Sequence, residues 1–279
     1  MNCYNCDRFL EEAIDSVYAQ SYKNWEIIFW DNASTDSSSL IAKGYDDRLK
    51  YFLSKETKPL GLARNFALEE ASGTYISFLD CDDVYLPRKI EIQVSNMQTD
   101  NSVLSYGSWI EIDENGLEIK KHKIQRKYPP TFETLLKKYD VNFQTLMINK
   151  KLVNKGELVF DKNLTFSPDY ELVMRIAFYY PKLLVISDYL SKYRIHSDSL
   201  SSKCKQEKRR DFESIIESQK KMKMDSGVRD FDLLVKILKI RMKFRDSLSE
   251  RKFVNLFLYL LLLIFLFSKY KIMTIIRIK

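Results

Sequence analysis

Three carboxylates follow a short apolar run near residue 80, in the sequence LDCDD at residues 79–83. The apolar run, residues 75–79, is typical of a buried strand, so the acidic side chains are expected where that strand enters a loop. Clustered carboxylates repel one another unless a cation neutralises them, and Mg²⁺ and Mn²⁺ prefer oxygen ligands. In extended backbone, Asp80 and Asp82 would point to the same side. The segment predicts either a divalent-cation site that engages phosphate or a solvated acidic turn.

Strand and helix patterns alternate through the first hundred residues. Apolar residues recur at helical spacing over residues 9–17, and helices are also expected at 62–71 and 87–97. Short strands are expected at 26–30, 49–53 and 75–79. This alternation predicts an α/β fold with a mostly parallel central sheet flanked by helices. Ligands bind such sheets at the carboxyl ends of the strands, where Asp31 and Asp80 both lie.

The second hundred residues follow a different pattern. Residues 103–119 predict a β-hairpin with its turn at 113–116, residues 145–148 a further strand, and residues 169–179 a helix. We find no GxGxxG or GxxxxGK[ST] sequence, so neither a dinucleotide-binding loop nor a P-loop is expected.

Charge is distributed unevenly along the chain. Residues 1–100 carry 10 Lys and Arg against 17 Asp and Glu, whereas the remaining residues carry 35 against 21. The acidic first part does not suit a nucleic-acid groove, so no nucleic-acid partner is expected. The basic second part could face an anionic membrane surface. The four cysteines (Cys3, Cys6, Cys81 and Cys204) are expected to be free thiols in a reducing compartment. A metal or redox role for the CxxC pair Cys3 and Cys6 is the alternative, but the sequence has no second such pair to complete a zinc site.

A nearly continuous apolar segment, residues 253–267, lies near the end of the chain between basic residues. As a helix it would reach about 22 Å, which is short of the roughly 30 Å hydrocarbon core of a bilayer. Three interpretations remain open: a helix lying in the membrane plane, a short spanning helix, and a helix buried against protein. The basic flanks favour the first.

Several short motifs occur in a fixed order: Tyr4-Asn5, residues 10–17 and 20–26, DNASTD at 31–36, ARN at 63–65, LDCDD at 79–83 and YRIH at 193–196. With these motifs the chain resembles the family 2 glycosyltransferases of the GT-A fold, in particular bacterial cell-surface sugar transferases. The resemblance implies a nucleotide-diphospho-sugar transferase domain over residues 1–200, followed by a basic helical extension over 201–279. The QxxRW sequence of processive relatives is absent, which implies transfer of a single sugar.

The resemblance also implies roles for single residues in donor binding. Asp31 would recognise the nucleotide base, and a carboxylate suits the N–H group of uracil because it only accepts hydrogen bonds. Arg64 would help to hold the nucleotide, and Asp80 would lie near the ribose and the metal. Tyr4 and Asn5 would lie beside the nucleotide. The donor is therefore expected to be a UDP-linked sugar.

The same resemblance implies a metal site and a general base. Asp82 would be the main ligand of Mn²⁺ or Mg²⁺, and His196 would reach the metal or the diphosphate unless it lies in a polar surface loop. The metal would neutralise the departing diphosphate. Asp169 occupies the position of the base, with Pro168 where relatives carry Glu, although Asp169 could instead cap a helix. Glu171 is the alternative base.

These inferences predict that the protein is an inverting, metal-dependent glycosyltransferase of a surface-glycan pathway, such as cell wall, capsule or O-antigen synthesis. Its acceptor is expected to be a glycan carried by lipid, and the protein is expected to be cytoplasmic and peripheral on the inner face of the membrane. Two alternatives are a nucleotidyltransferase, which would be expected to carry a glycine-rich signature loop, and a non-catalytic partner of another transferase.

The start of the chain departs from the family pattern. Relatives have an apolar strand of about seven residues before the Tyr-Asn pair, whereas only three residues precede Tyr4 here. We therefore expect the first strand to be missing from this sequence, which would leave backbone groups of the central sheet unpaired.

Overall fold

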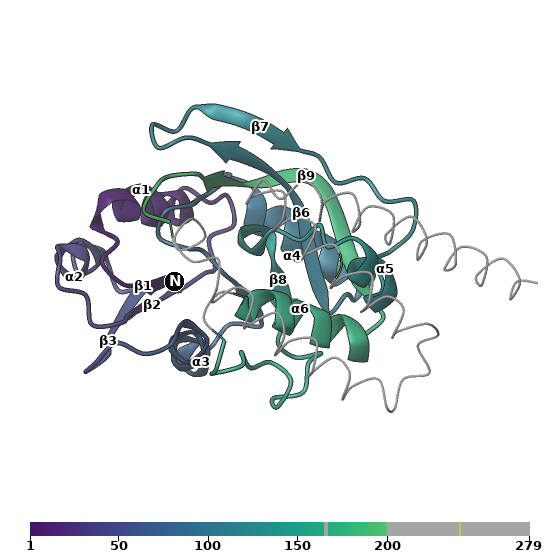
Figure 1. Ribbon diagram of the computed structural model, residues 1–279, viewed down its shortest axis with the longest axis horizontal. Coiled ribbons are helices and arrows are strands. Elements are labelled where there is room, and N and C mark those ends of the chain that lie inside the picture. The colour runs from purple at the N-terminus through teal and green to yellow at the C-terminus, as the bar shows by residue number, and fades with distance from the viewer. Residues whose placement is uncertain (165–166, 200–239, 241–279) are drawn as a thin grey trace, which may run out of the picture. The chain divides into compact units, whose positions relative to one another are not determined.

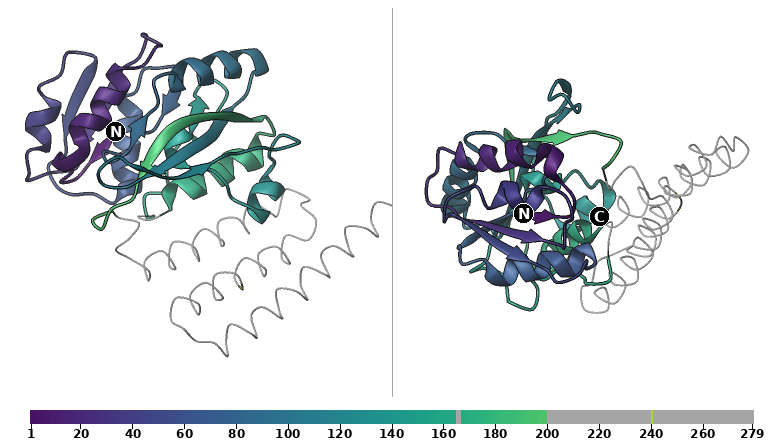
Figure 2. Two further views of the ribbon diagram at one scale, coloured as in Figure 1. Left: turned by 90° about the horizontal axis from the view of Figure 1, so that it is seen from above. Right: turned by 90° about the vertical axis from the view of Figure 1, so that its left-hand side faces the viewer.

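A computed structural model of the chain describes residues 1–164, 167–199 and 240. The chain divides into two compact units, one formed by residues 1–135 with 139–213 and the other by 136–138 with 214–279. The first unit contains the elements that concern the site (Figure 1, Figure 2). The apolar segment 253–267 lies outside the described residues. Among the residues that are described, no helix has the length and apolar character needed to cross a membrane.

A three-stranded parallel sheet forms the N-terminal part of the first unit. It has the order β1 (Asn2–Cys3), β2 (Ile27–Asp31), β3 (Leu49–Leu53). Helix α1 (Asp7–Tyr18) connects β1 to β2, and α2 (Ser38–Ala42) precedes β3. The apolar face of α1 packs on this sheet through Leu10, Ala13, Ile14 and Val17, as the helical spacing predicted.

A second, mixed sheet has the order β4–β8–β6–β9–β5, and β7 pairs with β6 at its edge. Its strands are β4 (Tyr75–Ser77), β5 (Val84–Tyr85), β6 (Leu104–Ile112), β7 (Glu118–His122), β8 (Met147–Asn149) and β9 (Leu183–Arg194). The two long strands, β6 and β9, run parallel over most of their length. Strands β6 and β7 form the expected hairpin. In Figure 1 the labels of β6, β8 and β9 lie to the right of the purple N-terminal elements.

Helices cover the sheets and carry several site residues. They are α3 (Leu60–Glu70), α4 (Lys89–Asp100), α5 (Phe132–Lys137) and α6 (Pro168–Tyr179), with a short 3₁₀ helix η1 (Phe143–Thr145). Gly61 allows the start of α3 to pack closely on the segment before α6, because a Cβ atom there would lie 2.2 Å from the carbonyl oxygen of Asp161. This contact fixes α3 beside residues 160–164.

The first strand is present in a short form, where the sequence led us to expect none. Only Asn2 and Cys3 form β1, paired in parallel with Trp30 and Asp31 of β2. The Met1 ammonium group continues the ladder by donating to the carbonyl oxygen of Ile28 at 2.8 Å, and burial lowers the pKa of this group. A cavity of about 720 Å³ borders Met1 and is lined by residues of β2, β4, α3 and α4.

The expectation of four free thiols is wrong for two of them. Cys3 and Cys6 form a disulfide with a Cα–Cα distance of 5.9 Å. The chain turns between the end of β1 and the start of α1, and this turn brings two cysteines only three positions apart into bonding range. Cys81 is a buried free thiol.

Candidate active site

The loop after β2 is organised around Asp31. Its carboxylate is fully buried and accepts hydrogen bonds from the backbone N–H of Ser34 at 2.7 Å and the hydroxyl of Tyr51 at 2.6 Å. Asn5, at a positive φ of 52°, accepts a hydrogen bond from the backbone N–H of Thr35 at 2.8 Å. Asp31 thus holds the loop from inside. Its role in base recognition stays a prediction.

The residues before α1 present a side chain outward. Tyr4 is 55% exposed and lies next to Asn5, so it is free to contact a ligand placed over the loop. The structure therefore places Tyr4 and Asn5 beside the Asp31 loop, and their position next to a nucleotide stays a prediction.

Arg64 lies in an aromatic cradle beneath the acidic turn. Its guanidinium carbon is 4.2 Å from the ring centroid of Phe143 and 5.5 Å from that of Phe160. Asn65, the next residue of α3, fixes the cradle because its side chain accepts a hydrogen bond from the Phe160 N–H at 2.7 Å and donates to its carbonyl oxygen at 2.9 Å. A guanidinium stacked in this way keeps its donors available for a carboxylate or a phosphate.

Asp80 is held by two residues from distant parts of the chain. Its carboxylate accepts hydrogen bonds from Arg64 at 3.2 Å and from the side-chain amide of Gln144 at 2.6 Å. The amide oxygen of Gln144 in turn accepts the backbone N–H of Asp80 at 2.9 Å. Sequence reasoning missed Gln144, which belongs to none of the motifs. The two contacts fix the carboxylate at the end of β4.

Asp80 and Asp82 lie in a tight turn, whereas the sequence led us to expect extended backbone. The alternation of side chains along a strand therefore does not explain where these two carboxylates point. The backbone N–H of Asp83 donates to the carbonyl oxygen of Asp80 at 3.2 Å, and this bond bends the chain. The side chains of Asp80 and Asp82 are 38% and 32% exposed, respectively. Both can therefore reach a ligand.

The structure brings Asp82 and His196 together, although 114 positions separate them. The Nε2 atom of His196 lies 2.9 Å from Oδ2 of Asp82, and the Nδ1 atom is buried without a partner in the described structure. Burial, followed by the negative charge of Asp80, raises the pKa of Asp82, whereas His196 lowers it. A carboxylate and an imidazole at the end of a strand are suitable ligands for a divalent cation, and a cation there would relieve the repulsion from Asp80.

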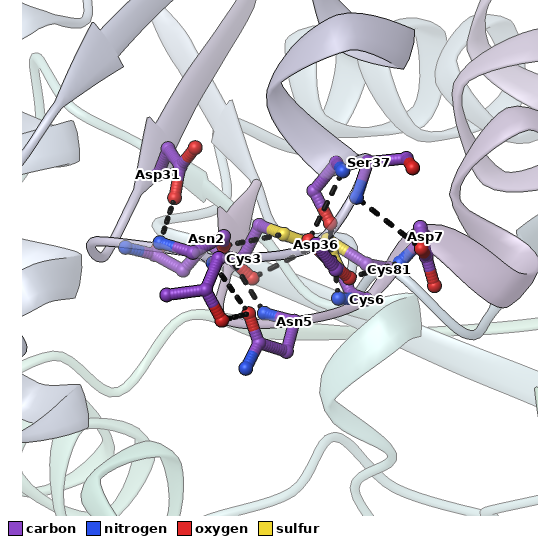
Figure 3. The surroundings of a disulfide bond; sticks show 12 residues. Asn2, Cys3, Asn5, Cys6, Asp7, Asp31, Asp36, Ser37 and Cys81 are labelled. Carbon is purple, nitrogen blue, oxygen red and sulfur yellow. Dashed lines mark hydrogen bonds between the residues drawn. A yellow bond between two sulfur atoms is a disulfide. The ribbon is translucent and has the colours of Figure 1, made fainter.

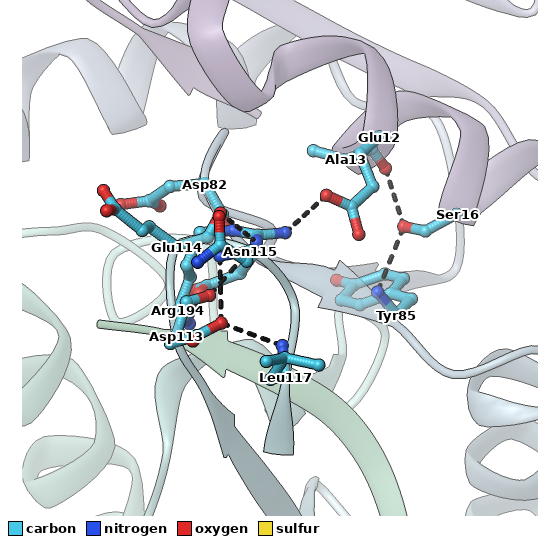
Figure 4. A network of polar contacts seen from close by, with 11 residues as sticks. Glu12, Ala13, Ser16, Asp82, Tyr85, Asp113, Glu114, Asn115, Leu117 and Arg194 are labelled. Atoms are coloured by element: carbon cyan, nitrogen blue, oxygen red, sulfur yellow. Dashed lines mark hydrogen bonds and ion pairs between the residues drawn. The ribbon is translucent and has the colours of Figure 1, made fainter. Parts of the chain in front are cut away.

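Arg194, at the end of β9, ties the acidic turn to α1 and to the β6–β7 turn (Figure 4). The side chain is 1% exposed and pairs with Glu12 of α1. Its Nε donates to the carbonyl oxygen of Asp82 at 2.9 Å, and its backbone N–H donates to the carboxylate of Asp83 at 2.7 Å. Its Nη1 also lies 3.3 Å from carbonyl oxygens of the β6–β7 turn. The YRIH motif therefore supplies the anchor of the turn as well as His196.

Asp169 lies in the first turn of α6, after Ser167 as the N-cap and Pro168. It is half-buried. Burial raises its pKa, while the positive charge of Arg64 lowers it and the negative charge of Asp80 raises it. The charges of Arg64 and Asp80 thus act on the Asp169 carboxyl in opposite directions. A carboxylate with a raised pKa at this position can act as a proton acceptor.

Glu171 is committed to a structural ion pair. Its side chain is 5% exposed, and both carboxylate oxygens accept hydrogen bonds from Arg175 at 2.8 Å. The same Arg175 also donates to carbonyl oxygens of Glu157 and Val159. Glu171 is therefore not available as the alternative base, because its oxygens stabilise the packing of α6.

Comparison with known proteins identifies the family. The model described as glycosyl transferase family 2 matches residues 1–155. The curated protein "UDP-Glc:alpha-D-GlcNAc-diphosphoundecaprenol beta-1,3-glucosyltransferase WfgD" of Escherichia coli is 31% identical over 204 residues, which are 72% of this chain and 78% of that protein.

Solved structures show the same fold. The crystal structure of S. aureus TarS 1–349 in complex with UDP-GlcNAc matches with a TM-score of 0.71 and 17% identity, over 84% of this chain and 68% of that one. The mannosyltransferase PcManGT from Pyrobaculum calidifontis, in complex with GDP-Man and Mn²⁺, matches with a TM-score of 0.54 and 18% identity, over 71% of this chain and 56% of that one. The chain is thus a glycosyltransferase of family 2, with the α/β fold of the GT-A type.

Proposed function

We propose that this glycosyltransferase moves a single sugar from a UDP-linked donor to a lipid-linked glycan acceptor, with inversion at the anomeric carbon and with Mn²⁺ or Mg²⁺. The observation that carries the proposal is the pairing of Asp82 with His196 beside the Asp80–Arg64 pair. This arrangement gathers anionic metal ligands and a cation for phosphate at the end of one strand. A nucleotidyltransferase is not supported, because the family match is to glycosyl transferases.

The donor side of the site supports a uridine nucleotide. Asp31 and Asn5 shape one loop, and the exposed Tyr4 adjoins it. A related E. coli enzyme is named for UDP-Glc, and a structural neighbour was solved with UDP-GlcNAc. We infer that Asp31 holds the loop in the conformation that binds the uracil base and that Arg64 contacts the diphosphate.

The residues at the acidic turn fit a divalent cation. Asp82 and His196 would hold it, because the Asp82 side chain is 32% exposed and the Nε2 atom of His196 lies 2.9 Å from its Oδ2 atom. A bound Mn²⁺ or Mg²⁺ supplies positive charge that neutralises the leaving diphosphate. Asp80 is already held by Arg64 and Gln144, which assigns it to orientation of the donor.

Asp169 serves as the base in this proposal. It removes the proton from the acceptor hydroxyl, and the resulting oxygen attacks the anomeric carbon opposite the leaving diphosphate, which inverts the configuration. The positive charge of Arg64 lowers the pKa of Asp169 and so opposes the effect of burial on this carboxyl. A positioned base of this kind contributes about 10²–10⁴ in rate.

The acceptor and location follow from the relatives and from charge. The name of the E. coli relative includes a diphosphoundecaprenol acceptor. The residues after 100 carry an excess of Lys and Arg, which suits an anionic membrane surface. We propose that the protein acts in a surface-glycan pathway as a cytoplasmic, peripheral protein on the inner face of the membrane.

Release of UDP from UDP-sugars, in the presence of Mn²⁺ and a lipid-linked acceptor, tests the proposal. The variant Asp82→Asn should lose at least about 10²-fold in rate, as metal-site and charge-stabilising groups typically do. Asp188→Asn is the matched control, because Asp188 is exposed on β9 away from the turn, and it should retain full activity. Full activity of Asp82→Asn would reject the metal assignment. Binding of UDP-sugar without turnover by the parent chain would favour the non-catalytic partner.

A further inference from the structure

Three cysteine sulfurs gather where β1 ends and α1 begins (Figure 3). The Sγ atoms of Cys3, Cys6 and Cys81 all lie within 4.8 Å of one another. They come from two separate pieces of backbone: the stretch from the end of β1 to the residue before α1, which carries Cys3 and Cys6, and the acidic turn, which carries Cys81. Cys3 and Cys81 are buried and Cys6 is half-buried, so the cluster is largely shielded from water.

Polar groups beside Cys3 and Cys6 favour sulfur in its thiolate form, whereas burial raises the pKa of the Cys81 thiol well above its usual range. The hydroxyl of Ser34 lies 3.6 Å from Sγ of Cys3, and that of Ser38 donates to Sγ of Cys6 at 3.6 Å. Cys6 directly precedes the 12-residue helix α1, whose N-terminal end carries a partial positive charge. Hydroxyl donors and a helix N-terminus both stabilise a thiolate relative to a thiol. The surroundings therefore suit ligation of a cation by sulfur.

We propose that the reduced form of this cluster binds one thiophilic divalent cation of the Zn²⁺ type through the Sγ atoms of Cys3, Cys6 and Cys81. With Zn–S bonds of about 2.3 Å, tetrahedral ligands lie roughly 3.8 Å apart. The Cys81 sulfur lies within 4.8 Å of the other two, and the sulfurs of Cys3 and Cys6, which are bonded to each other in the structure, would separate to this spacing after reduction. Sulfur selects Zn²⁺ over Mg²⁺ and Mn²⁺, so the site is chemically distinct from the oxygen and nitrogen ligands at Asp82 and His196.

Binding requires prior reduction of the Cys3–Cys6 bond, because the thiolate is the ligand. A dithiol reductant supplies two electrons and two protons to this bond and itself becomes a disulfide. The cation then replaces the protons of the three thiols, which pass to solvent. The disulfide and the metal complex are therefore alternative states of one cluster.

The bound cation would connect the donor loop to the acidic turn. Cys81 lies between Asp80 and Asp82, and Cys3 and Cys6 enclose Tyr4 and Asn5. One ion held by all three sulfurs would fix these two parts of the site relative to each other. Because the ion binds only after the disulfide is reduced, the redox state would control whether the two parts of the site are held together.

Cobalt spectroscopy of the full chain tests the proposal without any assay of sugar transfer. The protein is reduced with dithiothreitol, desalted under anaerobic conditions and titrated with Co²⁺. We expect a sulfur-to-cobalt charge-transfer band that saturates at one equivalent and disappears when Zn²⁺ is added. Omission of the reductant should abolish the band.

Single substitutions identify the ligands. Cys81→Ser should reduce the band by about one third, since one of three thiolates is lost, and should weaken Zn²⁺ binding at least about tenfold. Cys6→Ser, at a less buried position, should do the same and guards against a folding defect in the first variant. Cys204→Ser, which removes the fourth cysteine, should match the parent. Absence of the band in the reduced parent, an undiminished band in Cys81→Ser, or its loss in Cys204→Ser would overturn the proposal.

Discussion

Replacement of Arg194 by Ala should destabilise the first unit strongly, although Arg194 is not expected to touch a substrate. The guanidinium is fully enclosed, makes a 2.9 Å hydrogen bond to the Asp82 carbonyl oxygen, and stacks 4.5 Å from the ring centroid of Phe9. Arg194 also pairs with Glu12, but the Glu12 side chain is 53% exposed, so this ion pair contributes little to the free energy of unfolding. The buried contacts are therefore the ones that decide the effect.

The magnitude follows from those buried contacts. Each charge-assisted hydrogen bond contributes about 1.5–3 kcal/mol, and loss of one partner of a buried charged network costs about 3–5 kcal/mol. Asp83 would also lose the nearby positive charge that opposes its raised pKa. We therefore expect Arg194→Ala to lower the free energy of unfolding by about 3–5 kcal/mol and Tm by roughly 6–20 °C for a unit of this size.

Urea unfolding followed by tryptophan fluorescence measures this loss. Arg8→Ala is the matched control, because Arg8 pairs with Glu114 of the same β6–β7 turn but is 53% exposed, and it should change stability by less than about 0.5 kcal/mol. Arg194→Lys should lie between the two, because an ammonium group keeps the charge but cannot form the forked contacts. If Arg194→Ala and Arg8→Ala differ by less than about 1 kcal/mol, the reasoning from burial is wrong.

Three further predictions concern the site. Because the pKa of Asp169 is raised, its ionised, reactive form is lost at a higher pH than that of an ordinary aspartate. The acidic limb of the kcat/KM profile should therefore lie above the normal pH range for this side chain. In Asp169→Asn this limb should vanish and the rate should fall by about 10²–10⁴-fold. Gln144→Leu should raise KM for the donor, because Asp80 loses both of its contacts with that side chain. Gln144→Glu should raise KM further, because the new carboxylate repels that of Asp80. Unchanged donor kinetics in both variants would show that Gln144 does not belong to the site. Glu171→Gln should lower stability by about 1–3 kcal/mol while kcat is retained, because the Arg175 pair is structural; a loss of kcat as large as that of Asp169→Asn would show that Glu171 is the base.

The sequence predicted elements whose signals are local. The apolar spacing of α1 and α6, the strand at Leu49–Leu53 and the β6–β7 hairpin all follow from side-chain periodicity and turn residues, and the structure contains each of them. These features depend on residues close together in the chain.

Features that depend on distant pairs could not be predicted in the same way. Gln144 holds Asp80 across 64 positions, and no spacing rule links the two residues. The turn at Asp80–Asp83 departs from extended geometry because its conformation is set by Arg194, far along the chain. The disulfide at Cys3 was missed because composition alone argued for free thiols.

The anchoring of the acidic turn also has a consequence for the order in which the protein is made. The family match ends at residue 155, yet the turn is held by a residue 111 positions beyond Asp83. During synthesis, the first sheet and α1 leave the ribosome long before Arg194 and His196 do. A nascent chain can therefore bury much of its apolar surface while the carboxylates of the acidic turn still lack their anchor. The acidic turn gains this anchor late in the synthesis of the unit, after the first sheet and α1 have been made.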